Sequence, residues 1–154
     1  MGNKNYKKIE QNMISKTILD KLLEINKKNY YVKKITDKTH PCNDQFGLFS
    51  VKRYNKYDII GEYIGEAVDI FNLDKDFHSD YFAGFSVDGL KGIGIDAQNM
   101  GNEMRFINHY KGILTKPNVK FVNYLDGIFS KIMVVCICEI NIGEELVVDY
   151  GYEP

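Results

Sequence analysis

The feature that most constrains the fold is the texture of the chain after residue 29. From Tyr30 onward, short runs rich in Val, Ile, Tyr and Phe alternate with Gly, Asn and Asp, as in YYVKKI, GLFSVKRY, DIIGEYIG and IFSKIMVVCICEI. Such runs, bounded by turn residues, are typical of short β-strands. They do not alternate with helical patterns, which argues against a doubly wound fold. The sequence therefore predicts a mainly β fold, with a hairpin at Asp126-Gly127.

Residues 11–28 follow a different period. Ile14, Ile18, Leu22 and Ile25 recur every three or four positions, with Lys and acidic residues between them. This spacing predicts an amphipathic helix packed on the body of the protein. The chain has 154 residues, which suits a single core. We therefore expect a basic helical segment over 1–29 and one β-rich domain over 30–154.

Charge is distributed unevenly along the chain. Residues 1–40 carry ten Lys and four acidic residues, a balance of +6, so the net charge of -1 leaves -7 for the rest. The overall balance argues against direct binding of nucleic acid. Two interpretations of the acidic part stay open: a solvated helix beside an acidic body, or an acidic body that attracts a basic partner such as a lysine-rich tail.

The chain shows no signature of a membrane or secreted protein. No apolar run approaches the roughly 18 residues of a membrane span, and none resembles a signal peptide. Three cysteines, Cys42, Cys136 and Cys138, make no disulfide framework and favour a reducing, intracellular compartment. Cys136 and Cys138 lie in a strand-like run, and we expect two buried structural thiols on one face. No metal is expected, because the histidines and cysteines lack ligand spacing.

Five short motifs occur in a fixed order. They are FGLFS at 46–50, IIGEYIGE at 59–66, GIDAQNMGNEMRFINH at 94–109, KPN at 116–118 and GEELVVDYGY at 143–152. Each alone is weak, since RFINH by itself fits a strand-to-loop corner with Phe106 and Ile107 in a core. Together they resemble the SET domain of protein lysine methyltransferases, over about 41–152. The alternative, an unrelated structural β-domain, requires all five motifs to be coincidental.

The resemblance implies a fold and a cofactor. Similar proteins consist of small curled β-sheets with a C-terminal pseudoknot, which would bring Asn108, His109 and Tyr150 together. Their cofactor is S-adenosylmethionine, which leaves as S-adenosylhomocysteine. Asn108 would hydrogen-bond its amino group, and Gly47, lacking a Cβ, would permit its close approach. The cofactor-binding residues implied in this way are Gln45, Phe46, Gly47, Tyr81, Arg105, Phe106, Asn108 and His109.

The resemblance also assigns the reaction. Tyr150 matches the tyrosine treated as catalytic in the family, and Tyr63 matches one that lines the lysine channel, so both are predicted catalytic residues. Phe121, Val148 and Tyr152 are the predicted substrate-channel residues. Each tyrosine has a structural alternative, Tyr63 as a core residue and Tyr150 as a half-buried strand end. Glu144 and Glu145 fall in the family's turn and are predicted to have a structural, surface role.

Four departures from the family pattern bear on function. Gln45 replaces the first glycine of the cofactor turn, and Tyr110-Lys111 replace a small Ser and a Cys. The cysteine-rich segment that closes the channel in many relatives is absent from this sequence, so the N-terminal helix, a second subunit of a homodimer or further sequence would have to close it. Val148 replaces an aromatic residue, and with Phe121 it predicts room for a second or third methyl group.

The sequence thus predicts a protein lysine N-methyltransferase that uses S-adenosylmethionine. A histone tail is the favoured substrate and another lysine-rich protein the next, which would make the protein a chromatin regulator. A nuclear location would follow only from that substrate. The alternative is a weak or inactive SET-like module that binds a protein or peptide. Gln45 favours this alternative, whereas the retained Asn108, His109, Tyr63 and Tyr150 argue against it.

Overall fold

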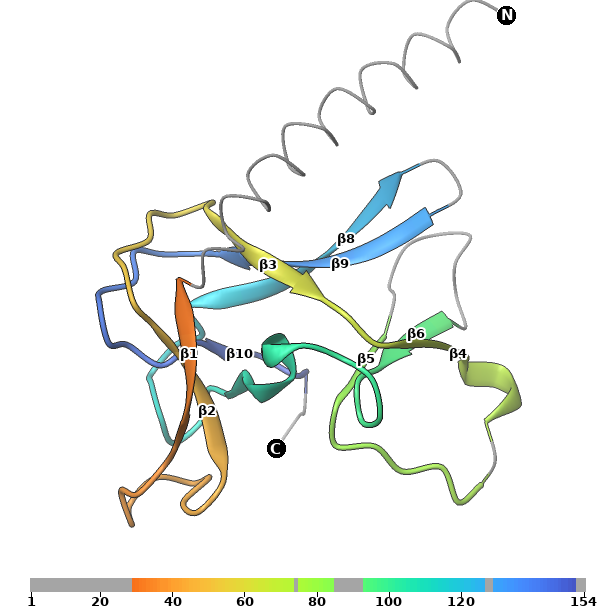
Figure 1. Cartoon of the computed structure of the whole chain (residues 1–154), viewed down its shortest axis with the longest axis horizontal. Coiled ribbons are helices and arrows are strands. Elements are labelled where there is room, and N and C mark those ends of the chain that lie inside the picture. The colour runs from red at the N-terminus through yellow and green to blue at the C-terminus, as the bar shows by residue number, and fades with distance from the viewer. Residues whose placement is uncertain (1–28, 74, 85–92, 127–128, 152–154) are drawn as a thin grey trace, which may run out of the picture.

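The computed structural model describes residues 29–73, 75–84, 93–126 and 129–151, which form four small β-sheets (Figure 1). This confirms the mainly β prediction. The predicted helix at 11–28 lies outside the described residues. The elements are β1 (Tyr30–Lys34), β2 (Phe46–Ser50), β3 (Ile59–Tyr63), β4 (Glu66–Asp69), β5 (Phe82–Gly84), β6 (Ile93–Asp96), β7 (Asn108–His109), β8 (Val119–Asp126), β9 (Phe129–Cys136) and β10 (Val147–Val148), with the 3-10 helices η1 (Ile70–Asn72) and η2 (Glu103–Phe106).

Three of the sheets are antiparallel. Strand β1 pairs with β2, β9 lies between β3 and β8, and β6 lies between β4 and β5. The hairpin predicted around Asp126-Gly127 is confirmed, because β8 and β9 pair along their whole length as far as Asp126 and Phe129. The fourth sheet is different: β7 and β10 are only two residues each, far apart in sequence, and pair in parallel.

The core contains buried side chains from β2, from η2 and from the residue before β10. Leu48 in β2, Met104 in η2 and Leu146 beside β10 are all fully buried. Each such side chain contributes about 1.5–3 kcal/mol relative to an exposed position. The short strands therefore keep their place through side-chain packing across the core, since two-residue strands have few hydrogen bonds of their own.

One cysteine prediction is wrong. Cys136 is fully buried, but Cys138 is exposed. The alternation that would put both thiols on one face stops because β9 ends at Cys136. Burial, helped by the nearby charge of Asp58, raises the pKa of the Cys136 thiol to about 12, so this thiol stays protonated at neutral pH.

Strand β10 is held by the side chain of Asn118. The amide nitrogen of Asn118 donates to the carbonyl oxygen of Glu145 at 2.8 Å, and its amide oxygen accepts the N–H of Val147 at 2.8 Å. The amide thus pairs with the backbone as a neighbouring strand would. Asn118 is only 3% exposed, so these bonds lie out of water. These two hydrogen bonds from Asn118 fix the position of the segment that leads to Tyr150.

Candidate active site

The third and the last of the five motifs meet at β7 and β10. Asn108 and His109 face Val147 and Val148 in the parallel register, and the N–H of Tyr110 donates to Val148 at 3.0 Å. The Tyr150 hydroxyl donates to the carbonyl oxygen of Ile107, and the Tyr150 N–H donates to Nδ1 of His109 at 3.1 Å. The rings of His109 and Tyr150 stack, with centroids 5.6 Å apart. The predicted adjacency of these motifs is present.

An aromatic cluster lies beside this junction. Phe106, at the end of η2, has the ring of Phe46 at 5.8 Å and the ring of Tyr81 at 6.2 Å. The guanidinium of Arg105 lies 4.9 Å from the centre of the Phe106 ring and 5.4 Å from that of Tyr81, and it donates to the carbonyl oxygen of Ala97. Phe46 is 48% exposed. Four predicted cofactor residues, from three separate segments, therefore share one partly open surface.

The two tyrosines predicted to be catalytic have different environments. Tyr63, at the end of β3, is buried and packs against Phe121 with ring centroids 5.2 Å apart. Burial raises the pKa of the Tyr63 hydroxyl above its usual value, and the charge on a nearby Tyr150 would raise it further. Tyr150 is 40% exposed. The site thus has one buried tyrosine, Tyr63, whose hydroxyl stays neutral, and one tyrosine, Tyr150, that is partly exposed to solvent.

Two clefts open on either side of Phe121. The first, which we call the Tyr150 cleft, has a volume of about 420 Å³ and is lined by Ser79, Asp80, Phe82, Ala83, Phe121, Asp149 and Tyr150. The second, the Val148 cleft, has a volume of about 340 Å³ and is lined by Pro117, Val119, Lys120, Phe121, Ile137, Val148, Asp149 and Gly151. Two of the three predicted channel residues, Phe121 and Val148, therefore line clefts. Tyr152 lies outside the described residues.

A buried polar network connects β2, β7 and the segment before β10. Nε2 of His40 lies 2.7 Å from Oε2 of Glu145, and the side chains are 12% and 7% exposed. The other oxygen of Glu145 accepts from Nδ2 of Asn108 at 3.0 Å. The surface role predicted for Glu145 is wrong, since it sits at the centre of this network. Glu144 does close a turn, accepting the N–H of Asn141 at 2.9 Å.

Gly47 is required by this network. A Cβ on Gly47 would lie 2.6 Å from Oε1 of Glu145 and 3.1 Å from the ring of Phe49. The space that the absent side chain leaves is thus occupied by the Glu145 carboxylate. Gln45, the departure from the family pattern, is exposed in the loop before β2 and makes backbone hydrogen bonds to Ile35 and Cys42.

Sequence reasoning missed His40, Glu145 and Asn118 as parts of the site. His40 lies 105 residues from its partner Glu145, and no local pattern connects the two. Asn118 belongs to the KPN motif, which by itself gives the side chain no role. The closest available signal was the run GEEL, in which one of two adjacent acidic residues precedes three apolar residues and must turn toward a core.

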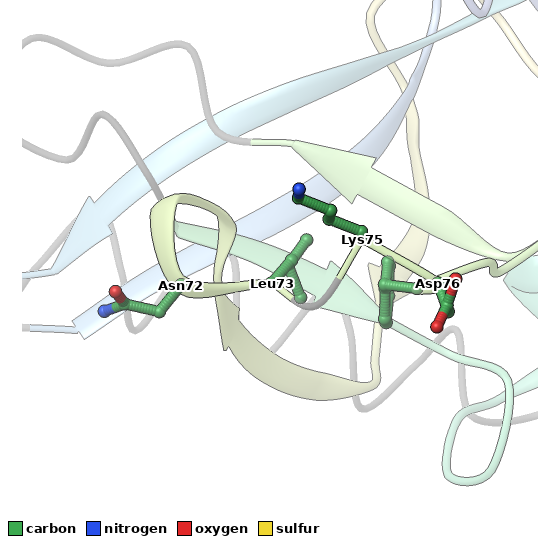
Figure 2. Close-up of a pocket in the computed structure, with 5 residues that line it drawn as sticks. Asn72, Leu73, Lys75 and Asp76 are labelled. Atoms are coloured by element: carbon green, nitrogen blue, oxygen red, sulfur yellow. The ribbon is translucent and has the colours of Figure 1, made fainter.

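A further hollow lies away from these residues, on the segment after η1 (Figure 2). Its volume is about 450 Å³ and it is lined by Asn72, Leu73, Lys75, Asp76 and Phe77. Figure 2 shows the side chains of Asn72 and Asp76 pointing toward opposite ends of this segment. The lining contains none of the residues predicted from the motifs, so we treat this hollow separately from the candidate site.

Comparison with known proteins decides the family. A family model for the SET domain matches residues 45–151, about two thirds of the chain and most of the region described above. The chain belongs to the SET domain family. The SET domain match spans the turn at Gln45, the β7 and β10 junction and Tyr150, so the motifs and the parallel pairing fall within one recognised unit.

The relatives of this SET domain are much longer proteins. This chain is 29% identical over 113 residues to histone-lysine N-methyltransferase EZ1 of Zea mays. It is 32% identical over 115 residues to histone-lysine N-methyltransferase set1 of Dictyostelium discoideum. These matches cover 71% and 70% of this chain but 12% and 7% of the relatives. A crystal structure of the polycomb repressive complex 2 of Chaetomium thermophilum matches with a TM-score of 0.61 and 25% identity, over 80% of this chain and 15% of that chain.

Within the described ranges, the acidic, His and Cys side chains form no group of three or more that is placed to hold a metal ion. Across the same residues, no helix has the length and apolar character needed to cross a membrane.

Proposed function

We propose that this SET domain is an S-adenosylmethionine-dependent protein lysine N-methyltransferase. One observation carries the proposal: β7, which contains Asn108 and His109, pairs with β10, and the Tyr150 hydroxyl after β10 bonds to the Ile107 carbonyl just before β7, with the buried Tyr63 near enough for Tyr150 to influence its pKa. Membership of the family and the two histone-lysine methyltransferase relatives support it. The wider pseudoknot, with one segment threaded past the other, stays a prediction.

The residues around Asn108 fit the cofactor. A flat purine can pack on the open face of Phe46 and Phe106, with Tyr81 and Arg105 as walls. The amide oxygen of Asn108 would accept from the cofactor's cationic amino group, and the His109 backbone would meet the adenine. When bound, the cofactor supplies an electrophilic methyl group on a sulfonium.

The tyrosines would prepare the lysine. A free lysine has a pKa near 10.4, so removing its proton at pH 7 costs about 4–5 kcal/mol. An apolar channel walled by Tyr63 and Phe121 lowers that cost by disfavouring the charged amine. The Tyr150 hydroxyl donates to the Ile107 carbonyl, which fixes the direction of the hydroxyl, and its oxygen would orient the amine by accepting an N–H from it. Most of the acceleration would come from this positioning.

The surroundings of the clefts favour a basic protein substrate. Asp80 and Asp149 line the Tyr150 cleft, so acidic side chains would attract basic residues that flank a target lysine there. A histone tail fits this charge, and a nuclear location would follow from it. We also propose that the apolar pair Val148 and Phe121 leaves room for more than one methyl group, so dimethyl-lysine should appear among the products.

Transfer of radiolabelled methyl from S-adenosylmethionine to purified core histones tests the proposal. Label on a histone lysine supports the enzyme and its substrate class. Label only on other proteins of a cell extract keeps the enzyme and overturns the histone. Absence of label on any protein, with cofactor binding also absent by calorimetry, overturns the proposal in favour of a binding module.

A further inference from the structure

The buried contacts of His40 fix which of its ring nitrogens carries the proton. The backbone N–H of Cys42 donates to Nδ1 of His40 at 3.0 Å, so Nδ1 is an acceptor and carries no hydrogen. Nε2 must then carry the proton, and it donates to Oε2 of Glu145 at 2.7 Å. The ring is therefore a fixed donor toward Glu145.

Glu145 in turn fixes the amide of Asn108. The two hydrogens on Nδ2 of Asn108 are donated to Oε1 of Glu145 and to the carbonyl oxygen of Phe46, both at 3.0 Å. An asparagine amide is often ambiguous in a structure, but two acceptors on the same side allow only the nitrogen there. The amide oxygen of Asn108 consequently lies on the opposite side, away from Glu145.

Glu145 can do this only as a carboxylate. It receives donors at both oxygens, from His40 and from Asn108, and each oxygen of a carboxylate accepts. A glutamine of the same shape has one acceptor oxygen and one donor nitrogen. Gly47 leaves the space that lets the carboxylate reach both partners, since a Cβ there would lie 2.6 Å from Oε1.

We propose that His40 and Glu145 are positioning residues that hold the Asn108 amide with its oxygen turned toward the cationic amino group of the cofactor. The inference deepens the proposed function and rests on it, because it assumes that Asn108 meets the cofactor. Neither His40 nor Glu145 touches the reacting atoms. Their effect is to settle the amide orientation before the cofactor arrives, so that binding does not have to reorder it.

The decisive variant is Glu145→Gln, with Glu144→Gln as its matched control. The introduced glutamine faces two donors with one acceptor, so either a contact is lost or Asn108 rotates and turns its oxygen toward the new amide nitrogen. We expect S-adenosylmethionine to bind roughly tenfold to a hundredfold more weakly, as for loss of a hydrogen bond to a charged group. Glu144→Gln changes the same charge at the preceding residue, in the turn, and should leave affinity unchanged.

Rescue separates positioning from simple stabilisation. In the double variant His40→Gln/Glu145→Gln, the side chain introduced at position 40 can present its oxygen to the amide nitrogen of the one introduced at position 145. The oxygen of that second amide can then accept from Asn108. We expect affinity to recover at least in part, although two buried side chains have been changed. Kinetically, Glu145→Gln should raise KM for the cofactor much more than it lowers kcat.

The experiment combines calorimetry with nitrogen-15 NMR of the ligand-free full chain. The expected results are the Nε2-protonated ring for His40, weaker cofactor binding in Glu145→Gln and recovery in the double variant. The Nδ1-protonated ring, unchanged affinity in Glu145→Gln, or absence of rescue while all variants melt cooperatively would overturn the inference alone. Absence of cofactor binding by the wild-type chain would overturn the proposed function, and the role given to Asn108 with it.

Discussion

The strands β2 and β10 and the sheet formed by β4, β6 and β5 lie on different sides of the molecule (Figure 1), and the junction of β2, β7 and β10 is held together differently from that sheet. At the junction, buried side chains make the hydrogen bonds: Asn118 is 3% exposed and Glu145 is 9% exposed. Beside the sheet, in residues 70–80, Phe71 is 78% exposed and Phe77 is 37% exposed. The junction carries the proposed cofactor contact at Asn108, whereas Ser79, Asp80, Phe82 and Ala83 line the Tyr150 cleft.

This contrast indicates that the junction and residues 70–80 serve different functions. A cofactor of fixed shape benefits from a site whose groups are locked by packing and hydrogen bonds. A protein substrate is bound by a surface with fewer buried contacts, where local opening costs less. Substitutions in the junction should therefore reduce stability and cofactor binding, and substitutions in residues 70–80 should act mainly on substrate binding.

The largest effect should come from Asn118→Ala. The variant removes both side-chain bonds to the segment before Tyr150 and leaves a buried N–H and a buried carbonyl without those partners. We expect the free energy of unfolding to fall by about 2–4 kcal/mol. Urea denaturation measures this, with Asn99→Ala, an exposed asparagine, as control. A loss as small as that of the control would remove the contrast between the two regions.

The next prediction concerns Tyr63 and pH. Its pKa is raised in the folded protein, chiefly by burial. Below the unfolded-state pKa of about 10, the Tyr63 hydroxyl is protonated in both states and the stability of the fold is fully present. As pH rises above this value, the unfolded state releases this proton more easily than the folded state, so the free energy of unfolding falls by up to about 1.4 kcal/mol per pH unit. Tyr63→Phe should remove this part of the pH dependence, and Tyr57→Phe, which changes a 73% exposed ring, should not. Identical pH profiles for wild type and Tyr63→Phe would place Tyr63 in contact with water.

A smaller effect is expected at Ser79, on the cleft side. Its hydroxyl donates to Oδ1 of Asp96 at 2.6 Å, but that oxygen also accepts the N–H of Gln98. Ser79→Ala should therefore lower the free energy of unfolding by about 1 kcal/mol. A loss equal to that of Asn118→Ala would show that both regions are equally locked.

The smallest effect should follow from Asp80→Asn. Asp80 lines the Tyr150 cleft but is exposed, so its attraction to a basic peptide is weakened by solvent. We expect KM for a lysine-rich peptide to rise about twofold at low salt and to match wild type at high salt. Asp76→Asn, in the separate hollow, is the control. An effect on cofactor affinity instead would contradict the division between the two regions.

The sequence predicted which motifs meet better than it predicted the side chains that hold them together. The resemblance to the SET domain implied that the segments of Asn108 and Tyr150 lie side by side, and strand-like runs located β8 and β9. The two-residue strands β7 and β10 have no periodicity to read, and their pairing depends on Asn118 and the core beneath. The contact between His40 and Glu145 spans 105 positions, and Cys138 is exposed because β9 stops two residues before it. Long-range polar contacts and strand ends were thus the features that local patterns could not supply.

The most direct test of the central claim is methyl transfer by Tyr150→Phe beside Tyr57→Phe, measured by mass spectrometry on a lysine-rich peptide with saturating S-adenosylmethionine. Tyr150 bonds to Ile107 at the junction, whereas Tyr57 is exposed and lies in none of the clefts described. The account predicts that the wild type and Tyr57→Phe transfer methyl groups and that Tyr150→Phe loses on the order of a hundredfold in kcat, for loss of positioning at the amine. Equal rates for the two variants would contradict it.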